Sequence, residues 1–254
     1  MKKIILSSST LFLIMTAFIA VGQPNREFRQ LTPEQIENMR KARAEQLAND
    51  WGGLAHYREA NEKAGLPAPA EKRVIFMGDS ITQGWGRTDP DFFTGKPWLN
   101  RGISGQTTPQ MLVRFRADVI KLKPTVVVIL AGINDIAGNT GPSTLDMIED
   151  NLSSMVDLAR ANGIRVVLTS VLPAYAFPWN PGLQPAEKVV ELNAWIRDYA
   201  NTHGCIYVDY FTPMADEKHA MKGEYSFDGV HPNLAGYKVM EPLVEASIQK
   251  ALEK

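Results

Sequence analysis

Two motifs far apart in the chain carry the residue types of an activated nucleophile. Gly78-Asp79-Ser80 supplies a hydroxyl, and Asp228-Gly229-Val230-His231 supplies an imidazole with a carboxylate three residues away. A serine hydroxyl becomes a strong nucleophile when a base takes its proton, and the imidazole base needs a carboxylate to fix its tautomer. We therefore predict a catalytic triad of Ser80, His231 and Asp228.

Two further motifs offer donors for the oxyanion that forms when a nucleophile attacks a carbonyl. Gly105, in Gly102-Ile103-Ser104-Gly105, can present its backbone N–H with no Cβ in the way. Asn134, in Gly132-Ile133-Asn134-Asp135, can present its side-chain amide. Preorganised donors of this kind stabilise the charge that develops in the transition state. We predict an oxyanion hole formed by Gly105, Asn134 and the backbone N–H of Ser80.

Each motif by itself also has a purely structural interpretation. Gly and Asn tolerate left-handed turns, and Gly-Asp-Ser is ordinary helix-capping chemistry. Asp228 and His231 could form a loop ion pair or bind a metal, but no second cluster of acidic residues and histidines with ligand spacing stands beside them. Because all four motifs occur in one chain, we favour the catalytic interpretation and expect no metal and no organic cofactor.

Taken together, the four motifs resemble the blocks of the SGNH, or GDSL-type, esterases and acylhydrolases. The similarity rests on Gly-Asp-Ser followed by Ile-Thr-Gln-Gly-Trp, on Gly-Ile-Ser-Gly-Gln-Thr, on Gly-Ile-Asn-Asp and on Asp-Gly-Val-His-Pro, and it begins near Asp50. It is strongest with the branch of platelet-activating-factor acetylhydrolase-like enzymes and bacterial carbohydrate esterases. Gln106 departs from the pattern, since many members carry Asp there. The resemblance implies a flavodoxin-like fold and assigns five roles: nucleophile to Ser80, base to His231, orienting acid to Asp228, and oxyanion donors to Gly105 and Asn134.

The elements expected from the sequence place these motifs at one edge of a sheet. Apolar, β-branched runs predict strands, and helical stretches fill the gaps between them. The strands are expected at 73–77, 97–101, 125–131, 165–171 and 205–209, and the helices at 107–121, 143–162, 186–202 and 234–252. Continuous apolar runs are typical of strands covered on both faces. Right-handed crossovers then predict a three-layer α/β/α sandwich with a central parallel sheet, whose site lies at the carboxyl ends of the strands.

Three segments are expected along the chain. Lys2-Lys3, an apolar run and small residues before position 23 predict a secretory signal peptide over 1–22, so we expect export to the periplasm or the cell exterior. Residues 23–70 are expected to form a helical arm, with Thr32 as the N-cap of a helix and Gln35 closing a capping box. The arm has too few apolar residues for a core of its own, so it should dock on a hydrolase domain at 71–254.

Composition argues against several classes of partner. The 254 residues carry a formal net charge of −1, and such a chain lacks the basic surface that attracts nucleic acids. The apolar run of the signal is too short to span a bilayer, so we expect no stable membrane insertion after cleavage. Cys205 is the only cysteine, and it opens an apolar run, which favours packing in the core.

The aromatic residues near the motifs favour a small or carbohydrate-linked ester as substrate. The loop 173–181 follows a predicted strand, and its Tyr175 and Trp179 could stack on a sugar or line an acyl slot. Trp85, just after the nucleophile, could do the same. An exported, cofactor-free esterase with such a loop suits short acyl groups, acetyl first among them, on carbohydrate.

Two alternatives stay open at this point. The first is a lysophospholipase or another acylhydrolase of small esters. The second, more remote, is a phosphate- or flavin-binding module of the same fold, in which the turn before Ser80 would cradle a phosphate. That module would leave Asp228, His231 and Asn134 without a role.

Overall fold

Five parallel strands form one sheet at the centre of the molecule. A computed structural model describes residues 31–180 and 182–253. The strands are β1 (Val74–Gly78), β2 (Trp98–Gly102), β3 (Val126–Leu130), β4 (Arg165–Thr169) and β5 (Ile206–Val208), and their order across the sheet is β2-β1-β3-β4-β5. This is the strand order of flavodoxin-like sheets. The predicted fold class is confirmed.

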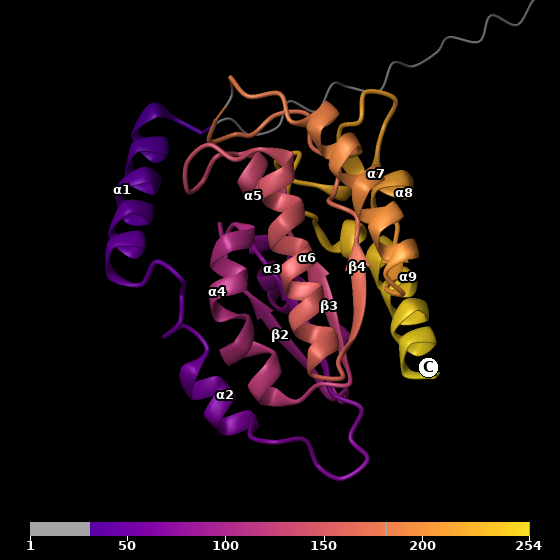
Figure 1. The fold of residues 1–254 in the computed structure, drawn as a ribbon. Coiled ribbons are helices and arrows are strands. Elements are labelled where there is room, and N and C mark those ends of the chain that lie inside the picture. Colours follow the sequence, from indigo (N-terminus) through magenta and orange to yellow (C-terminus); the bar gives the residue numbers. More distant parts are fainter. Residues whose placement is uncertain (1–30, 181, 254) are drawn as a thin grey trace, which may run out of the picture.

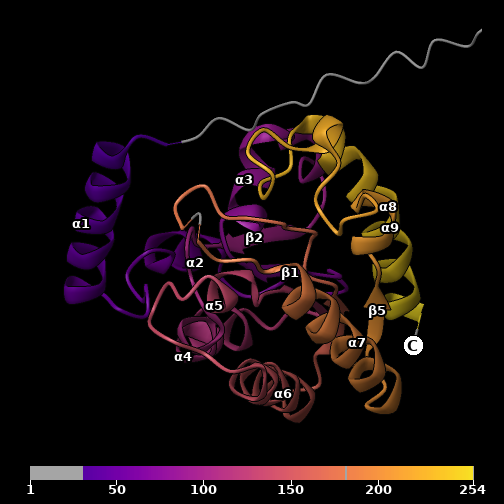
Figure 2. The same ribbon diagram turned by 90° about the horizontal axis from the view of Figure 1, so that it is seen from above.

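Helices cover both faces of the sheet, as Figures 1 and 2 show. α3 (Ser80–Thr88) and α9 (Leu234–Glu253) lie on one face, and α4 (Thr108–Asp118), α6 (Leu145–Ala161) and α7 (Ala186–Thr202) lie on the other. The connections hold two short helices and three 3-10 turns: α5 (Ile133–Ile136), α8 (Phe211–Met214), η1 (Pro90–Phe92), η2 (Ile120–Leu122) and η3 (Gly223–Tyr225). Within the described ranges, no helix is both long enough and apolar enough to cross a membrane.

The register of the strands brings several chain segments to one edge. Gly78, which ends β1, pairs with Gly102 at the end of β2 and with Leu130 at the end of β3. All residues of β1 and β3 are buried, as expected for strands between two helix layers. Because these three strands stop at the same level, the residues that follow them emerge side by side.

Over residues 31–70, the described part of the predicted arm, the chain forms two helices, α1 (Pro33–Asn49) and α2 (Arg58–Ala64). The predicted cap is confirmed, because the Thr32 hydroxyl accepts the N–H of Gln35 at 3.2 Å and Gln35 Oε1 accepts the N–H of Thr32 at 2.9 Å. α1 stands at the side of the domain that carries α2 and α4 (Figures 1 and 2), and none of its residues is buried. The predicted signal peptide lies outside the described residues.

Candidate active site

Three side chains from distant parts of the chain form a hydrogen-bonded row beyond the carboxyl ends of the strands. Ser80 Oγ lies 2.9 Å from Nε2 of His231, which is 151 residues further along the chain. Nδ1 of His231 lies 2.7 Å from Oδ2 of Asp228. These distances are those of hydrogen bonds. The structure therefore brings together the three side chains that the sequence predicts to act as a triad.

A tight turn from β1 into α3 positions Ser80. β1 ends at Gly78, and Asp79 caps α3 by accepting the N–H of Ile81 on Oδ1 at 2.9 Å. A Cβ on Gly78 would come within 2.1 Å of Thr82 Oγ1 and 2.9 Å of the Leu130 carbonyl, so the close approach requires glycine. Ser80 thus stands at the first residue of the helix, where backbone N–H groups lack intrahelical partners.

A second turn holds the carboxylate against the imidazole. Oδ1 of Asp228 accepts the N–H of Val230 at 2.9 Å and of His231 at 2.8 Å, which leaves Oδ2 for the ring. Ser226 Oγ donates to the His231 carbonyl at 2.7 Å and accepts the N–H of Gly229 at 2.9 Å. Ser226 is not among the predicted site residues, although a serine two positions before Asp-Gly is a common turn former.

Asp228 and His231 set each other's protonation. Burial alone disfavours charge on the His231 ring, but the hydrogen bond and charge of Asp228, with the charge of Asp79, outweigh it and raise the pKa of His231 above its ordinary value. Burial would also raise the pKa of Asp228, but the bonds from His231 and two backbone N–H groups leave that pKa below its ordinary value. Asp228 is therefore a carboxylate at neutral pH, and a neutral His231 ring protonated on Nδ1 presents Nε2 to Ser80 as an acceptor.

Asn134 and Gly105, the two other predicted oxyanion donors, lie in segments that are joined by hydrogen bonds. Asn134 Nδ2 donates to the Gln106 carbonyl at 3.1 Å and to Asp79 Oδ2 at 3.2 Å. Asn139 Nδ2 donates to Asn134 Oδ1 at 2.8 Å and to the Gly105 carbonyl at 3.2 Å, which fixes the orientation of the Asn134 amide. Asn139 was not predicted, because its spacing from Asn134 carries no recognisable pattern.

The backbone around Gly105 has a conformation that favours glycine. Its φ is +74°, in the left-handed region. Among the residues that the structure describes, neither the N–H of Gly105 nor that of Ser80 donates to an acceptor. Both groups are thus free to bind a ligand oxygen. Asn134 differs, because it would have to exchange one of its two bonds to donate to such an oxygen.

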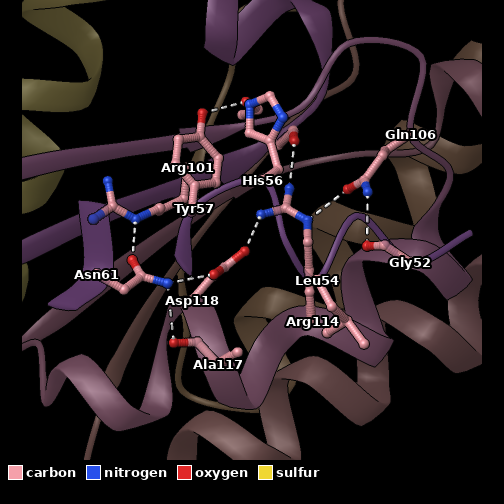
Figure 3. Close-up of polar contacts among 12 residues, drawn as sticks. Gly52, Leu54, His56, Tyr57, Asn61, Arg101, Gln106, Arg114, Ala117 and Asp118 are labelled. Atoms are coloured by element: carbon pink, nitrogen blue, oxygen red, sulfur yellow. Dashed lines mark hydrogen bonds and ion pairs between the residues drawn. The ribbon is translucent and has the colours of Figure 1, made fainter. Parts of the chain in front are cut away.

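A buried polar network lies behind the Gly105 loop (Figure 3). Arg114, whose side chain is fully buried, donates from Nε to Gln106 Oε1 at 2.5 Å, from Nη1 to Asp118 Oδ2 at 2.9 Å and from Nη2 to the Gly78 carbonyl at 3.0 Å. Gln106 Nε2 donates in turn to the carbonyl of Gly52 in the arm at 3.0 Å. One guanidinium therefore connects the end of β1, the Gly105 loop and α4, and Gln106 extends this network to the arm.

The three aromatic residues predicted to contact substrate lie in different environments. The half-buried Trp179 lies beside His231, with ring centroids 5.9 Å apart, and Tyr175 is 49% exposed in the same loop. Trp85 is only 2% exposed and stacks on Phe92 and Tyr237. Its prediction as a substrate contact is wrong, because five residues along α3 rotate a side chain by roughly 140° from that of Ser80.

The described part of the chain holds no group of three or more His, Cys, Asp or Glu residues placed to bind a metal ion. Cys205, predicted to pack in the core, is partly buried and packs against the hydrophobic core.

Known proteins are similar to this chain over most of the domain that carries the site. The sequence profile of the GDSL-like Lipase/Acylhydrolase family matches residues 76–239, a span that contains Ser80 and His231. The crystal structure of a GDSL-like lipase from Bacteroides thetaiotaomicron is 47% identical, with a TM-score of 0.78, and the alignment covers 80% of this chain and 100% of that one. Esterase TesA from Pseudomonas aeruginosa is 27% identical over 182 residues, 65% of this chain and 82% of the esterase.

A further relative is an acetylxylan esterase from Xylanibacter ruminicola. It is 26% identical over 225 residues, which make up 72% of this chain and 45% of that enzyme. The chain thus spans about half the length of two curated relatives that it matches, since it also covers 52% of an uncharacterized lipoprotein from Bacillus subtilis.

Proposed function

The chain belongs to the GDSL-like lipase/acylhydrolase family of carboxylic ester hydrolases, and from this premise we propose that it is a secreted serine esterase that removes short acyl groups, acetyl first among them, from carbohydrate. One observation carries the proposal: Ser80 Oγ lies 2.9 Å from His231 Nε2, and His231 Nδ1 lies 2.7 Å from Asp228. A hydroxyl, an imidazole and a carboxylate in this order are what acyl transfer requires.

In the acylation step, His231 Nε2 takes the proton of Ser80 Oγ while Oγ attacks the ester carbonyl carbon. The carbonyl π electrons move onto oxygen, so the adduct is tetrahedral and negatively charged. Asp228 stabilises the resulting imidazolium across 2.7 Å. The imidazolium then protonates the leaving oxygen, the carbon–oxygen bond of the ester breaks, and the alcohol departs from an acyl-Ser80.

In the deacylation step, a water molecule attacks acyl-Ser80 while His231 takes one of its protons. Collapse of the second tetrahedral adduct returns that proton to Ser80 Oγ and releases the carboxylic acid. In both adducts the oxyanion accepts from the N–H groups of Ser80 and Gly105 and from the side chain of Asn134. The 3.2 Å bond from Asn134 to Asp79 is the longer of its two bonds, so it is the one that we expect to yield.

The position of Trp179 supports a sugar as the alcohol of the ester. His231 hands its proton to the leaving alcohol, so a group beside its ring lies next to that part of the substrate. The Trp179 ring is there, 5.9 Å from the imidazole between centroids, and aromatic faces are good surfaces for stacking a sugar ring. The similarity to an acetylxylan esterase supports the same choice.

Export is part of the proposal and rests on the sequence alone. Lys2-Lys3 followed by an apolar run and small residues within 1–22 is typical of a secretory signal peptide. A protein that is expressed with residues 1–22 and recovered outside the cytoplasm with its N-terminus near residue 23 would support it, and a protein that keeps residues 1–22 inside the cell would contradict it.

A panel of esters tests the activity and the substrate class together. The mature protein should hydrolyse p-nitrophenyl acetate faster than the octanoate ester, and should release acetate from acetylated xylo-oligosaccharides. Ser80→Ala should reduce both rates to near background while its melting temperature stays close to that of the wild type. A Ser80→Ala variant with most of the wild-type rate would refute the mechanism. Faster turnover of a lysophospholipid than of the acetylated sugars would favour the alternative substrate.

A further inference from the structure

A single arginine of the arm reaches the loop that carries Gly105. Arg43, in α1, donates from Nη2 to the Gly105 carbonyl at 2.7 Å and to Gln110 Oε1 at 3.1 Å. Its Nη1 donates to the Ser104 carbonyl at 3.4 Å and to Gln46 Oε1 at 3.2 Å. The guanidinium therefore holds the two carbonyl groups that flank the N–H of Gly105.

These two contacts act on the donor in different ways. The Ser104 carbonyl and the Gly105 N–H belong to one peptide group, so a positive charge on that carbonyl makes the N–H a stronger donor. The contact with the Gly105 carbonyl fixes the orientation of the peptide group between Gly105 and Gln106. Asn139 Nδ2 is a second donor to that carbonyl, at 3.2 Å. Because glycine has the least restricted backbone, these planes need outside contacts to stay in one orientation.

Arg43 attaches α1 through polar contacts that are partly shielded from water. No residue of α1 is buried, so the helix gains little from apolar packing. Arg43 Nε is buried without a hydrogen-bond partner among the described residues, which is unfavourable. Burial lowers the pKa of the guanidinium, and a charge shielded from water interacts more strongly with nearby dipoles.

We propose that Arg43 is a positioning residue for the oxyanion hole. It orients the Ser104–Gly105 peptide so that the N–H of Gly105 meets the oxyanion, and it strengthens that donor, without contacting the substrate. This inference rests on the proposed esterase function. It also gives the N-terminal arm a role in catalysis, through a side chain that lies 62 residues before Gly105 in the chain.

The test compares Arg43→Met with Arg40→Met in the full chain, on p-nitrophenyl acetate. Arg40 is exposed on the same helix, so its replacement controls for the loss of one positive charge on α1. Arg43→Met should lower kcat about tenfold, less than the roughly 10²–10³ that loss of an oxyanion donor itself costs. KM should change little, because the oxyanion forms only after the ester has bound. Arg40→Met should match the wild type.

A boronic acid that forms a tetrahedral adduct with Ser80 separates positioning from a merely structural role. Its affinity for Arg43→Met should fall by the same factor as kcat/KM, because the adduct places an oxygen in the oxyanion hole. Millimolar guanidinium should restore part of both quantities in Arg43→Ala, since the free cation can occupy the vacated position.

Three outcomes would overturn the inference: an Arg43→Met kcat equal to that of Arg40→Met, an unchanged boronate affinity, or an absence of guanidinium rescue. If the Met and Ala variants do not fold, Arg43→Lys decides, because it keeps the charge but not the forked donor pair. Its kcat should fall at an unchanged melting temperature, and a wild-type kcat would overturn the inference. A wild-type protein without Ser80-dependent hydrolysis would instead contradict the proposed function itself.

Discussion

Asp228 uses one carboxylate oxygen for two backbone N–H groups and the other for the ring of His231. The turn therefore fixes the carboxylate before any substrate arrives, and Ser226 supports it through the His231 carbonyl. A fixed negative charge beside the ring raises the pKa of His231. At the scale of single residues, this charge decides the pH range in which the base works.

Asp228→Asn should lower kcat by about 10⁴-fold and shift the acid limb of the kcat/KM profile to lower pH. His231 must be neutral to accept a proton, so its raised pKa puts the wild-type limb above the ordinary value of 6.5. Removing the carboxylate lowers that pKa, and the limb follows. Ser226→Ala is the control, because it loosens the turn but leaves the charge. Superimposable limbs in wild type and Asp228→Asn would contradict the assignment.

The sequence predicts the triad and the loop donors well, but it predicts their neighbours poorly. Ser80, Asp228 and His231 belong to compact motifs, whereas Asn139 and Arg43 each bond to the Gly105 carbonyl, a contact that appears only when separate segments fold together. Trp85 and Trp179 look equivalent in the sequence. The rotation of α3 about its axis turns Trp85 into the core, and the course of the loop 173–181 places Trp179 beside the base.

At the scale of elements, the contact between the end of β2 and the start of α3 sets the distance of Ser80 from the end of the sheet. A Cβ on Gly102 would lie 2.2 Å from the backbone nitrogen of Gln83 and 2.7 Å from the carbonyl of Asp79. Both are backbone atoms near the start of α3, so they can move only with the helix. The tight contact therefore keeps Ser80 close to the end of the sheet.

Gly102→Ala should destabilise the protein by about 1–3 kcal/mol and reduce kcat, because relieving the contact moves α3 and Ser80 with it. Gly86→Ala, later in α3, is the matched control: its Cβ would meet only Asn100 Nδ2 at 3.4 Å, and alanine favours helix by about 1 kcal/mol. Urea unfolding and ester hydrolysis measure both effects. Equal stability of the two variants would refute this account of the junction.

The strands and main helices fall within a few residues of the positions that the sequence predicts, because continuous apolar runs and capping residues specify them locally. The arm shows the limit of this reasoning. The spacing of Leu47, Trp51 and Leu54 suggests one packed helical face, but α1 ends at Asn49, and Trp51 and Leu54 are 42% and 44% exposed. Polar contacts hold the arm instead, and no periodic pattern predicts them.

At the scale of the whole molecule, a buried carboxylate joins the two chain segments that follow β2 and β3. Asp135, after β3, accepts the N–H of Thr108 at the start of α4 at 3.0 Å and its hydroxyl at 2.6 Å. Burial nevertheless raises the pKa of Asp135 to about 6, against the lowering effect of those hydrogen bonds. Burial also raises the pKa of Asp79 to about 6. The fold therefore holds two carboxylates that bind protons more tightly than the unfolded chain does.

Lowering the pH from 7 to 5 should raise the free energy of unfolding. The pKa of Asp135 is higher in the folded chain than in the unfolded chain, so protonation of this carboxyl favours the folded state. The resulting stabilisation is complete below the pKa of the unfolded chain, and it is lost as the pH rises through about 6. For Asp135 the difference between the two pH values is about 1 kcal/mol. Urea unfolding of the wild type and of Asp135→Asn measures it. The variant should show a smaller difference, and an equal one would contradict the burial of a titrating carboxylate.

The global topology could be predicted because parallel strands joined by helices have few arrangements. What could not be predicted is how closely the two ends of the domain meet. Tyr237, the fourth residue of α9, donates its hydroxyl to the Ile81 carbonyl in α3 at 2.7 Å, across 156 residues of chain. No local pattern in the sequence specifies such a contact.

Because of this contact, the rate of ester hydrolysis also reports on folding. A chain growing from its N-terminus carries Ser80 long before His231 exists, and we expect the imidazole to reach Ser80 only when α9 docks on α3. Until then the hydroxyl is no more reactive than that of any surface serine. The appearance of p-nitrophenolate from p-nitrophenyl acetate during refolding would therefore follow the docking of α9 on α3, without a label on the chain.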